Sequence, residues 1–210
     1  MVSVKKRLVQ CCISISLLML IPGAASAERF ADLFVGLSYT QDEDLKFSSA
    51  NQNEEVSMSF RASFTIGYRM GYWFDRLPNL GLALDATYTN IESDELDDYI
   101  DVVSITPLLM ARLPLMRSQK YPMGEWAPFF AVGPGLFISK ISAVDGAYAD
   151  RHEDLGIDLR TGVKKMMAIN WALNLEYRFF YVAPEYEDYD VDAEIDLYTH
   201  SLMVGMTYNF

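Results

Sequence analysis

The stretch HSLMVGMTYNF, residues 200–210, decides the fold class of this chain. Its side chains alternate between an apolar set and a small, largely polar set. Because a strand has a side-chain period of two, one face of this segment is apolar and the other is not. The apolar face consists of Leu202, Val204, Met206, Tyr208 and Phe210. A segment that stops on the apolar phase at an aromatic residue is unusual in a soluble sheet and favours a membrane-spanning β-barrel.

The same period of two recurs in seven segments upstream. Each is long enough, when tilted, to cross an apolar band of ~25 Å. Pro107 has no N–H to give to a ladder, and the run Gly133-Pro134-Gly135 predicts a bulge or bend. The eight predicted strands are residues 31–40, 56–70, 80–89, 100–113, 128–139, 156–165, 170–182 and 200–210.

Residues 1–27 have the three parts of a secretory signal peptide. Basic residues 5–7 precede an apolar stretch over residues 12–21, and the Ala-Ser-Ala pattern at 25–27 predicts cleavage before Glu28. Both cysteines of the chain lie inside this segment. The mature chain, residues 28–210, is therefore expected to form one barrel domain without disulfides or cysteine chemistry.

Charge and hydropathy narrow the class further. Removal of the three basic residues of the signal takes the formal net charge from −12 to −15. No mature segment approaches ~18 consecutive apolar residues, which excludes transmembrane helices. Two classes remain, a soluble β-domain and a membrane barrel. The acidic balance argues against nucleic acid as a partner, since nucleic acid requires a basic footprint.

The connections between the predicted strands fall into two sets. Residues 71–79, 114–127 and 166–169 form the short set, in or beside which all three tryptophans (73, 126 and 171) lie. The other set, residues 41–55, 90–99, 140–155 and 183–197, holds 21 of the 29 Asp and Glu residues. Bacterial barrels place short turns in the periplasm and long polar loops outside. We therefore expect acidic extracellular loops and an aromatic ring at the periplasmic boundary of the membrane.

The inward phase of the predicted strands carries both signs of charge. Charges inside a lumen require partners or water, and eight strands enclose a space that side chains just fill. We expect a structural plug of ion pairs, with a narrow ion path as the alternative, and no general porin. The residues concerned are Arg61, Arg69, Arg112, Arg160, Lys164 and Arg178, facing Asp32, Asp85, Asp158 and Glu176.

The mature chain as a whole resembles the outer-membrane β-barrel family, in the form of a stand-alone OmpA-type transmembrane domain. The segments that carry the resemblance are GYRMGYWFD (67–75), APFFAVGPGLFIS (127–139), LNLEYRFF (173–180) and residues 200–210. It implies an all-β, eight-stranded antiparallel up-and-down barrel in the bacterial outer membrane, in contact with lipid and lipopolysaccharide. It also implies that the barrel-assembly machinery reads the C-terminal strand ending at Phe210. No peptidoglycan-binding domain follows that strand in this sequence, so the wall-anchoring role of full-length OmpA is not implied.

Metal binding and catalysis find little support in the sequence. The run EYEDYDVDAEID (185–196) lacks the glycine and terminal glutamate spacing of an EF-hand. It favours a diffuse anionic surface that shares divalent cations with neighbouring lipopolysaccharide over a specific Ca²⁺ site. His152 falls in a predicted loop, and His200 faces outward near the outer boundary; neither belongs to a Ser-His-acid pattern. A partner for the His200 ring can still come from the first or seventh predicted strand.

We therefore predict no catalytic, cofactor-binding or metal-binding residues and no cofactor. The expected function is a non-enzymatic envelope role, either stabilising the outer membrane or presenting loops to an extracellular ligand that the sequence does not identify. A lipid A-modifying enzyme with dispersed catalytic residues and a narrow ion channel are the alternatives.

Overall fold

The computed structural model describes residues 28–41, 43–49, 52–58, 60–92, 99–142, 151–183, 185–188, 191–194 and 196–210. The predicted signal peptide, residues 1–27, lies outside these ranges. In the part of the chain that is described, no helix is long and apolar enough to cross a membrane.

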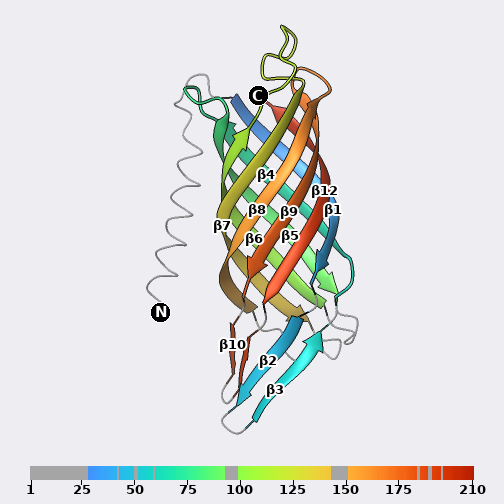
Figure 1. Ribbon diagram of the computed structural model, residues 1–210, viewed down its shortest axis with the longest axis vertical. Coiled ribbons are helices and arrows are strands. Elements are labelled where there is room, and N and C mark those ends of the chain that lie inside the picture. The colour runs from blue at the N-terminus through green and yellow to red at the C-terminus, as the bar shows by residue number, and fades with distance from the viewer. Residues whose placement is uncertain are drawn as a thin grey trace.

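Eight antiparallel strands close into a barrel in which each strand pairs with its neighbours along the chain (Figure 1). The seam that closes the barrel joins the first strand to the last, from Phe30 opposite Asn209 to Thr40 opposite Thr199. This confirms the predicted up-and-down barrel of eight strands. The strands are β1 (Glu28–Thr40), β4 (Ser63–Trp73), β5 (Leu80–Glu92), β6 (Tyr99–Arg112), β7 (Trp126–Ser142), β8 (Arg151–Met166), β9 (Trp171–Val182) and β12 (Leu197–Asn209).

Alternation along each strand separates an outer face from the lumen. On β9, exposed and buried side chains alternate strictly over residues 171–178. Leu37, paired with Leu202 across the seam, leaves 65 % of its surface on the outer face. Leu37 is one of many large apolar side chains that the barrel strands leave exposed on this face. Soluble monomers rarely expose a continuous apolar surface of that extent. The outer surface therefore has the chemistry of a protein surrounded by lipid.

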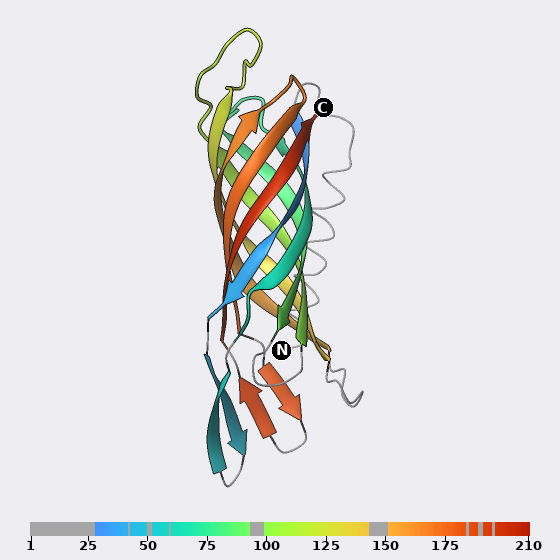
Figure 2. The ribbon, with the colours of Figure 1, turned by 90° about the vertical axis from the view of Figure 1, so that its right-hand side faces the viewer.

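The two ends of the barrel differ, and we name them by their connections. The turn end holds Phe210 and the connections 74–79, 113–125 and 167–170. The loop end carries a second, four-stranded sheet that extends away from the barrel (Figure 2). Its strands are β2 (Glu43–Ser49), β3 (Gln52–Met58), β10 (Glu185–Asp188) and β11 (Val191–Glu194), in the order β10-β11-β2-β3.

This second sheet corrects the prediction that residues 41–55 and 183–197 are loops. The strand β2 follows β1, and β11 precedes β12. Because β1 and β12 pair at the seam, the hairpins that extend from them become neighbours, and Val191 pairs with Ser49. Closure of the barrel brings together two segments that are far apart in the sequence.

The predicted strand over residues 56–70 is wrong at its start. The structure divides it between β3 and β4, with residues 60–62 outside both. Phe60, expected on the outer face, is 4 % exposed, whereas Arg61, expected in the lumen, is exposed. Residues 60–62 are not paired in the barrel ladder, so their side chains need not continue the alternation of β4. The inward and outward assignment made from the sequence therefore fails there.

Of the bulge or bend predicted at residues 133–135, the pairing of β6 with β7 rules out the bulge. Ile105 pairs with Leu136 and Leu109 with Val132, so the register between β6 and β7 is the same on both sides of the prolines. Between these two pairs, residues 106–108 of β6 and 133–135 of β7 lie side by side without pairing. A Cβ at Gly133 would collide with the carbonyl oxygen of Pro107. Glycine therefore lets the two strands remain close at this point.

All three tryptophans lie at the turn end, but they do not form one outward ring. Trp171 is exposed and packs against Tyr208 with 4.9 Å between ring centroids. Trp73 is 3 % exposed and stacks on Phe30 at 5.6 Å. Trp73 belongs to the buried phase of β4, shared with Arg69, which turns its ring into the mouth of the barrel.

Candidate functional site

A cluster of opposite charges fills the middle of the lumen, and we call it the charge cluster. Its eight side chains come from five strands, and all are buried. Each lies on the inward phase of its strand, as the alternation predicted. Four are cations and four are carboxylates, so the cluster is balanced. Its members are Arg69, Arg160, Lys164 and Arg178 with Asp32, Asp85, Asp158 and Glu176.

Arg160 is the centre of the charge cluster. Its Nη2 donates to Asp85 at 2.7 Å and to Asp158 at 2.9 Å. Its Nη1 donates to Asp85 at 2.9 Å and to Glu176 at 3.2 Å, and its Nε donates to Asp158 at 2.9 Å. These five bonds match the five N–H donors of a guanidinium. A fully used guanidinium is the condition under which burying it becomes tolerable.

The cluster extends toward the turn end through Arg69 and Lys164. Arg69 donates to Glu176 at 2.6 Å and to Asp32 at 3.3 Å. Lys164 Nζ lies 2.8 Å from the same Asp32 carboxylate. Toward the loop end, Arg178 Nη2 donates to Asp158 at 2.7 Å and to the Ser104 hydroxyl at 2.8 Å.

An aromatic ring lies within the charge cluster. Phe34 breaks the polar face of β1 in the sequence, and its ring centroid lies 5.3 Å from the guanidinium carbon of Arg69 and 5.7 Å from that of Arg160. Cations are attracted to the faces of such rings. Gly67, opposite Phe34 on β4, makes room for the ring, because a Cβ there would collide with it.

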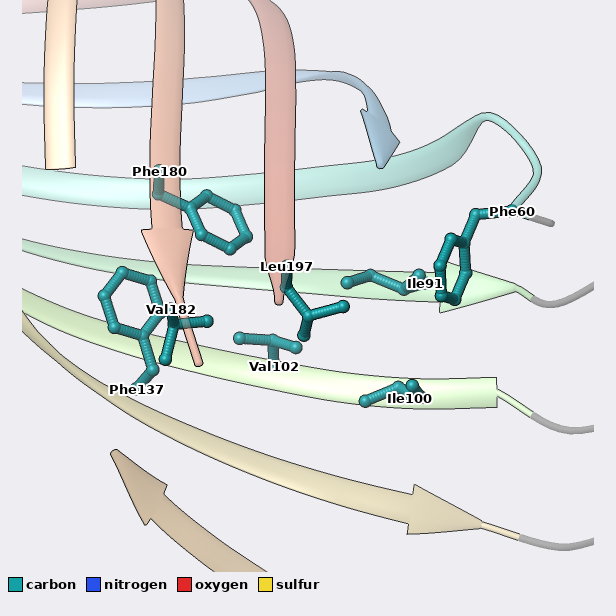
Figure 3. Packing of buried hydrophobic residues seen from close by; sticks show 8 residues of the cluster. All are labelled: Phe60, Ile91, Ile100, Val102, Phe137, Phe180, Val182 and Leu197. Carbon is teal, nitrogen blue, oxygen red and sulfur yellow. The ribbon is translucent and has the colours of Figure 1, made fainter. Parts of the chain in front are cut away.

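Apolar side chains fill the lumen on both sides of the charge cluster. Figure 3 shows the loop-end apolar cluster, in which Phe137 and Phe180 stack with 5.0 Å between centroids. The turn-end apolar cluster is built around Phe30, Trp73 and Phe129. Along the lumen, the charge cluster therefore lies between these two apolar clusters, and Lys164 reaches the turn-end one, with its Nζ 4.3 Å from the Phe30 ring centroid.

A belt of hydroxyl groups crosses four strands between the charge cluster and the loop-end apolar cluster. Ser38 Oγ lies 2.7 Å from Ser201 Oγ across the seam and 2.5 Å from Thr65 Oγ1. Thr65 Oγ1 lies 2.8 Å from Thr89 Oγ1. These buried hydroxyls therefore satisfy one another, which removes most of the cost of burying them.

Two of the predicted inward charges do not join the charge cluster. Arg61 is exposed outside the ladder. Arg112 lies at the turn end, where it forms a two-pronged pair with Glu28, at 2.9 and 2.5 Å, and stacks over Trp73 at 4.0 Å. A cavity of about 190 Å³ opens beside this pair, lined also by Lys120 and Tyr121.

The histidines lie apart from the charge cluster. His152, expected in a loop, is part of β8. His200 lies on β12, and its Nδ1 is 2.6 Å from Tyr177 Oη while its Nε2 is 3.0 Å from Gln41 Nε2. Tyr177 belongs to the seventh barrel strand and Gln41 follows the first, the two places left open for a partner of this ring. Sequence reasoning identified neither residue, because their proximity arises from the closing seam.

Among the described side chains, no group of three His, Cys, Asp or Glu residues is placed to hold a metal ion. Side chains of residues 185–194 fall outside that description. The diffuse sharing of divalent cations by the acidic run 185–196 stays a prediction.

Comparison with known proteins places this barrel in a family. Residues 13–210 match the family described as outer membrane protein β-barrel domain. Neisserial surface protein A is 17% identical, with a TM-score of 0.56 over 90% of this chain and 99% of that chain. OprG from Pseudomonas aeruginosa is 13% identical, with a TM-score of 0.64 over the same shares of the two chains.

A third similar structure is the outer membrane protein AlkL in lipid bilayers. It is 13% identical, with a TM-score of 0.54 over 90% of this chain and 95% of that one. No curated protein sequence matches significantly. At these identities the structures support the fold alone, while the family match covers residues 13–210, which is most of the chain. The chain therefore belongs to the outer membrane protein β-barrel domain family and is a bacterial outer-membrane protein.

Proposed function

We propose that this protein is a non-enzymatic envelope protein whose lumen is closed and whose acidic loop end faces the outside of the cell. The observation that carries the proposal is the charge cluster. Its four cations and four carboxylates are all buried and paired with one another. Such an interior supports a rigid barrel better than a water-filled path.

The two apolar clusters support a lumen without a continuous ion path. An ion moving along the axis would have to leave water twice, at the turn-end and loop-end apolar clusters, and to separate Arg160 from its carboxylates in between. Desolvating a charge without a partner costs several kcal/mol. A closed barrel in a membrane can still stabilise the lipid around it and present its loops.

The surface supports contact with outer-membrane lipid and lipopolysaccharide as the main partners. The outer face of the barrel is apolar, and the segments predicted to be extracellular hold 21 of the 29 Asp and Glu residues of the sequence. Carboxylates near lipopolysaccharide phosphates would share divalent cations with them.

The closing strand supports recognition by the barrel-assembly machinery. β12 pairs with β1 along its length, and the backbones of Phe210 and Arg29 exchange hydrogen bonds of 3.0 and 3.3 Å beyond it. The Phe210 side chain is 55 % exposed. An aromatic residue presented beside the seam is available to a partner while the barrel closes.

The orientation is tested with epitope tags on intact cells. Tags inserted at Asn51 or Asp188 should be labelled, whereas tags at Asn79 or Gln119 should require permeabilised cells. The opposite labelling pattern would contradict the proposed topology.

Three measurements test the function. The purified mature barrel in planar bilayers should give no stepwise conductance, and reproducible steps would favour the ion-channel alternative. Deleting the gene should raise the permeability of the envelope to a hydrophobic dye and leave the lipid A mass spectrum unchanged. A lost lipid A modification would favour the enzymatic alternative.

A further inference from the structure

On the outer face of the barrel, three polar side chains meet above an apolar surface, next to the loop end. They are Gln41, Tyr177 and His200, from three different segments. The backbone N–H of Gln41 donates to the Tyr198 carbonyl at 2.9 Å, which fixes Gln41 beside β12. His200 is flanked by Phe179, whose ring centroid lies 5.2 Å away.

The hydrogen bonds of this group leave donors free. Gln41 Nε2 carries only hydrogens, so it donates to His200 Nε2 at 3.0 Å. The imidazole proton then lies on Nδ1 and is donated to Tyr177 Oη at 2.6 Å. Both ring nitrogens of His200 are then engaged in hydrogen bonds. The Tyr177 O–H and the second N–H of the Gln41 amide remain available to donate to a ligand. Two donors are thus held in place by an imidazole between them.

The surroundings indicate an amphiphilic ligand. Leu37 and Leu202 are the next outward-facing residues toward the turn end, and they are 65 % and 60 % exposed. They therefore form an apolar surface that acyl chains can contact. Tyr39 lies opposite His200 across the seam and is 49 % exposed, and Tyr177 is 42 % exposed. Tyr39 on β1 and Tyr177 on β9 therefore flank His200 from the two strands beside β12, and an exposed ring can stack against the C–H face of a sugar. Asp196, which immediately precedes β12, accepts a hydrogen bond from Tyr181 at 2.7 Å.

We propose that Tyr177 and Gln41, held by His200, bind a phosphate of an acylated phosphosaccharide, the glycolipid of the outer leaflet. The acyl chains lie on the apolar surface below, and the sugar stacks on the exposed tyrosine rings. His200 is a positioning residue in this site and takes no part in chemistry. The inference rests on the proposed orientation, which places the loop end in the outer leaflet.

The test measures lipid binding to the refolded mature chain in nanodiscs by native mass spectrometry. The probes are a diphosphorylated acyl-disaccharide lipid, the same lipid without phosphates, and phosphatidylglycerol. Wild-type protein should retain the phosphorylated glycolipid about tenfold more tightly than the other two, because the dephosphorylated lipid lacks the charged acceptor and phosphatidylglycerol lacks the sugar that stacks on the exposed rings. Tyr177→Phe keeps the ring and removes the donor, and should abolish that preference.

Tyr208→Phe, at the opposite boundary of the barrel, is the matched control and should bind as wild type does. Circular dichroism and heat-modifiable gel mobility establish that each variant is folded. Equal binding of the two glycolipids, unchanged binding by Tyr177→Phe, or equal binding of phosphatidylglycerol would each overturn the inference. If these occur while tags at Asn51 still label intact cells, the proposed function stands and only this site is lost. Reversed tag labelling would instead remove the proposed orientation itself.

Discussion

Replacing Arg160 with methionine tests whether the charge cluster holds the barrel together. The substitution keeps a side chain of similar reach but removes five hydrogen bonds to Asp85, Asp158 and Glu176. Four buried carboxylates then share three cations. Removing one partner of a buried ion pair costs about 3–5 kcal/mol, because a charge is left without compensation. We expect a loss of that size in the free energy of unfolding.

The measurement is urea unfolding in lipid vesicles, followed by tryptophan fluorescence and by gel mobility. Arg76→Met, in the exposed turn after β4, is the matched control and should stay within about 0.5 kcal/mol of wild type. Adding Asp85→Asn to Arg160→Met restores equal numbers of charges and should recover about 1–2 kcal/mol. If Arg160→Met unfolds within about 1 kcal/mol of wild type, water solvates the carboxylates and the reasoning from a dry ion network fails.

Three further substitutions test other parts of the structure by the same unfolding assay. Gly67→Ala should lose about 1–3 kcal/mol, because its methyl group would collide with the Phe34 ring between two arginines; an unchanged midpoint would show that the ring has room to move. Glu28→Gln should lose only about 1 kcal/mol, since the Glu28–Arg112 pair is partly exposed at the mouth; a loss as large as that of Arg160→Met would contradict this ranking. His200→Ala should change stability by less than about 1 kcal/mol and leave lipid A composition unchanged, and a lost modification in a folded barrel would make His200 catalytic.

Strand parity is the part of the fold that the sequence alone determined. The period of two is a property of the extended backbone itself, so the lumen-facing side of Asp32, Asp85 or Arg178 could be assigned without knowing any neighbour. The same local rule placed Leu37 and Leu202 on the outer face. It failed at Phe60 and Arg61, where the chain leaves the ladder between β3 and β4 and the alternation restarts.

Which side chains meet was decided only by the tertiary structure. Arg160 contacts carboxylates from β5, β8 and β9, and their heights in the lumen follow from the stagger between strands in the closed barrel. The seam between β1 and β12 likewise brings Gln41 to His200 and pairs β2 with β11. Stagger and closure depend on all eight strands at once, whereas parity depends on each residue's own backbone. The sequence could therefore predict the two faces of this barrel, and the contacts on each face required the closed structure.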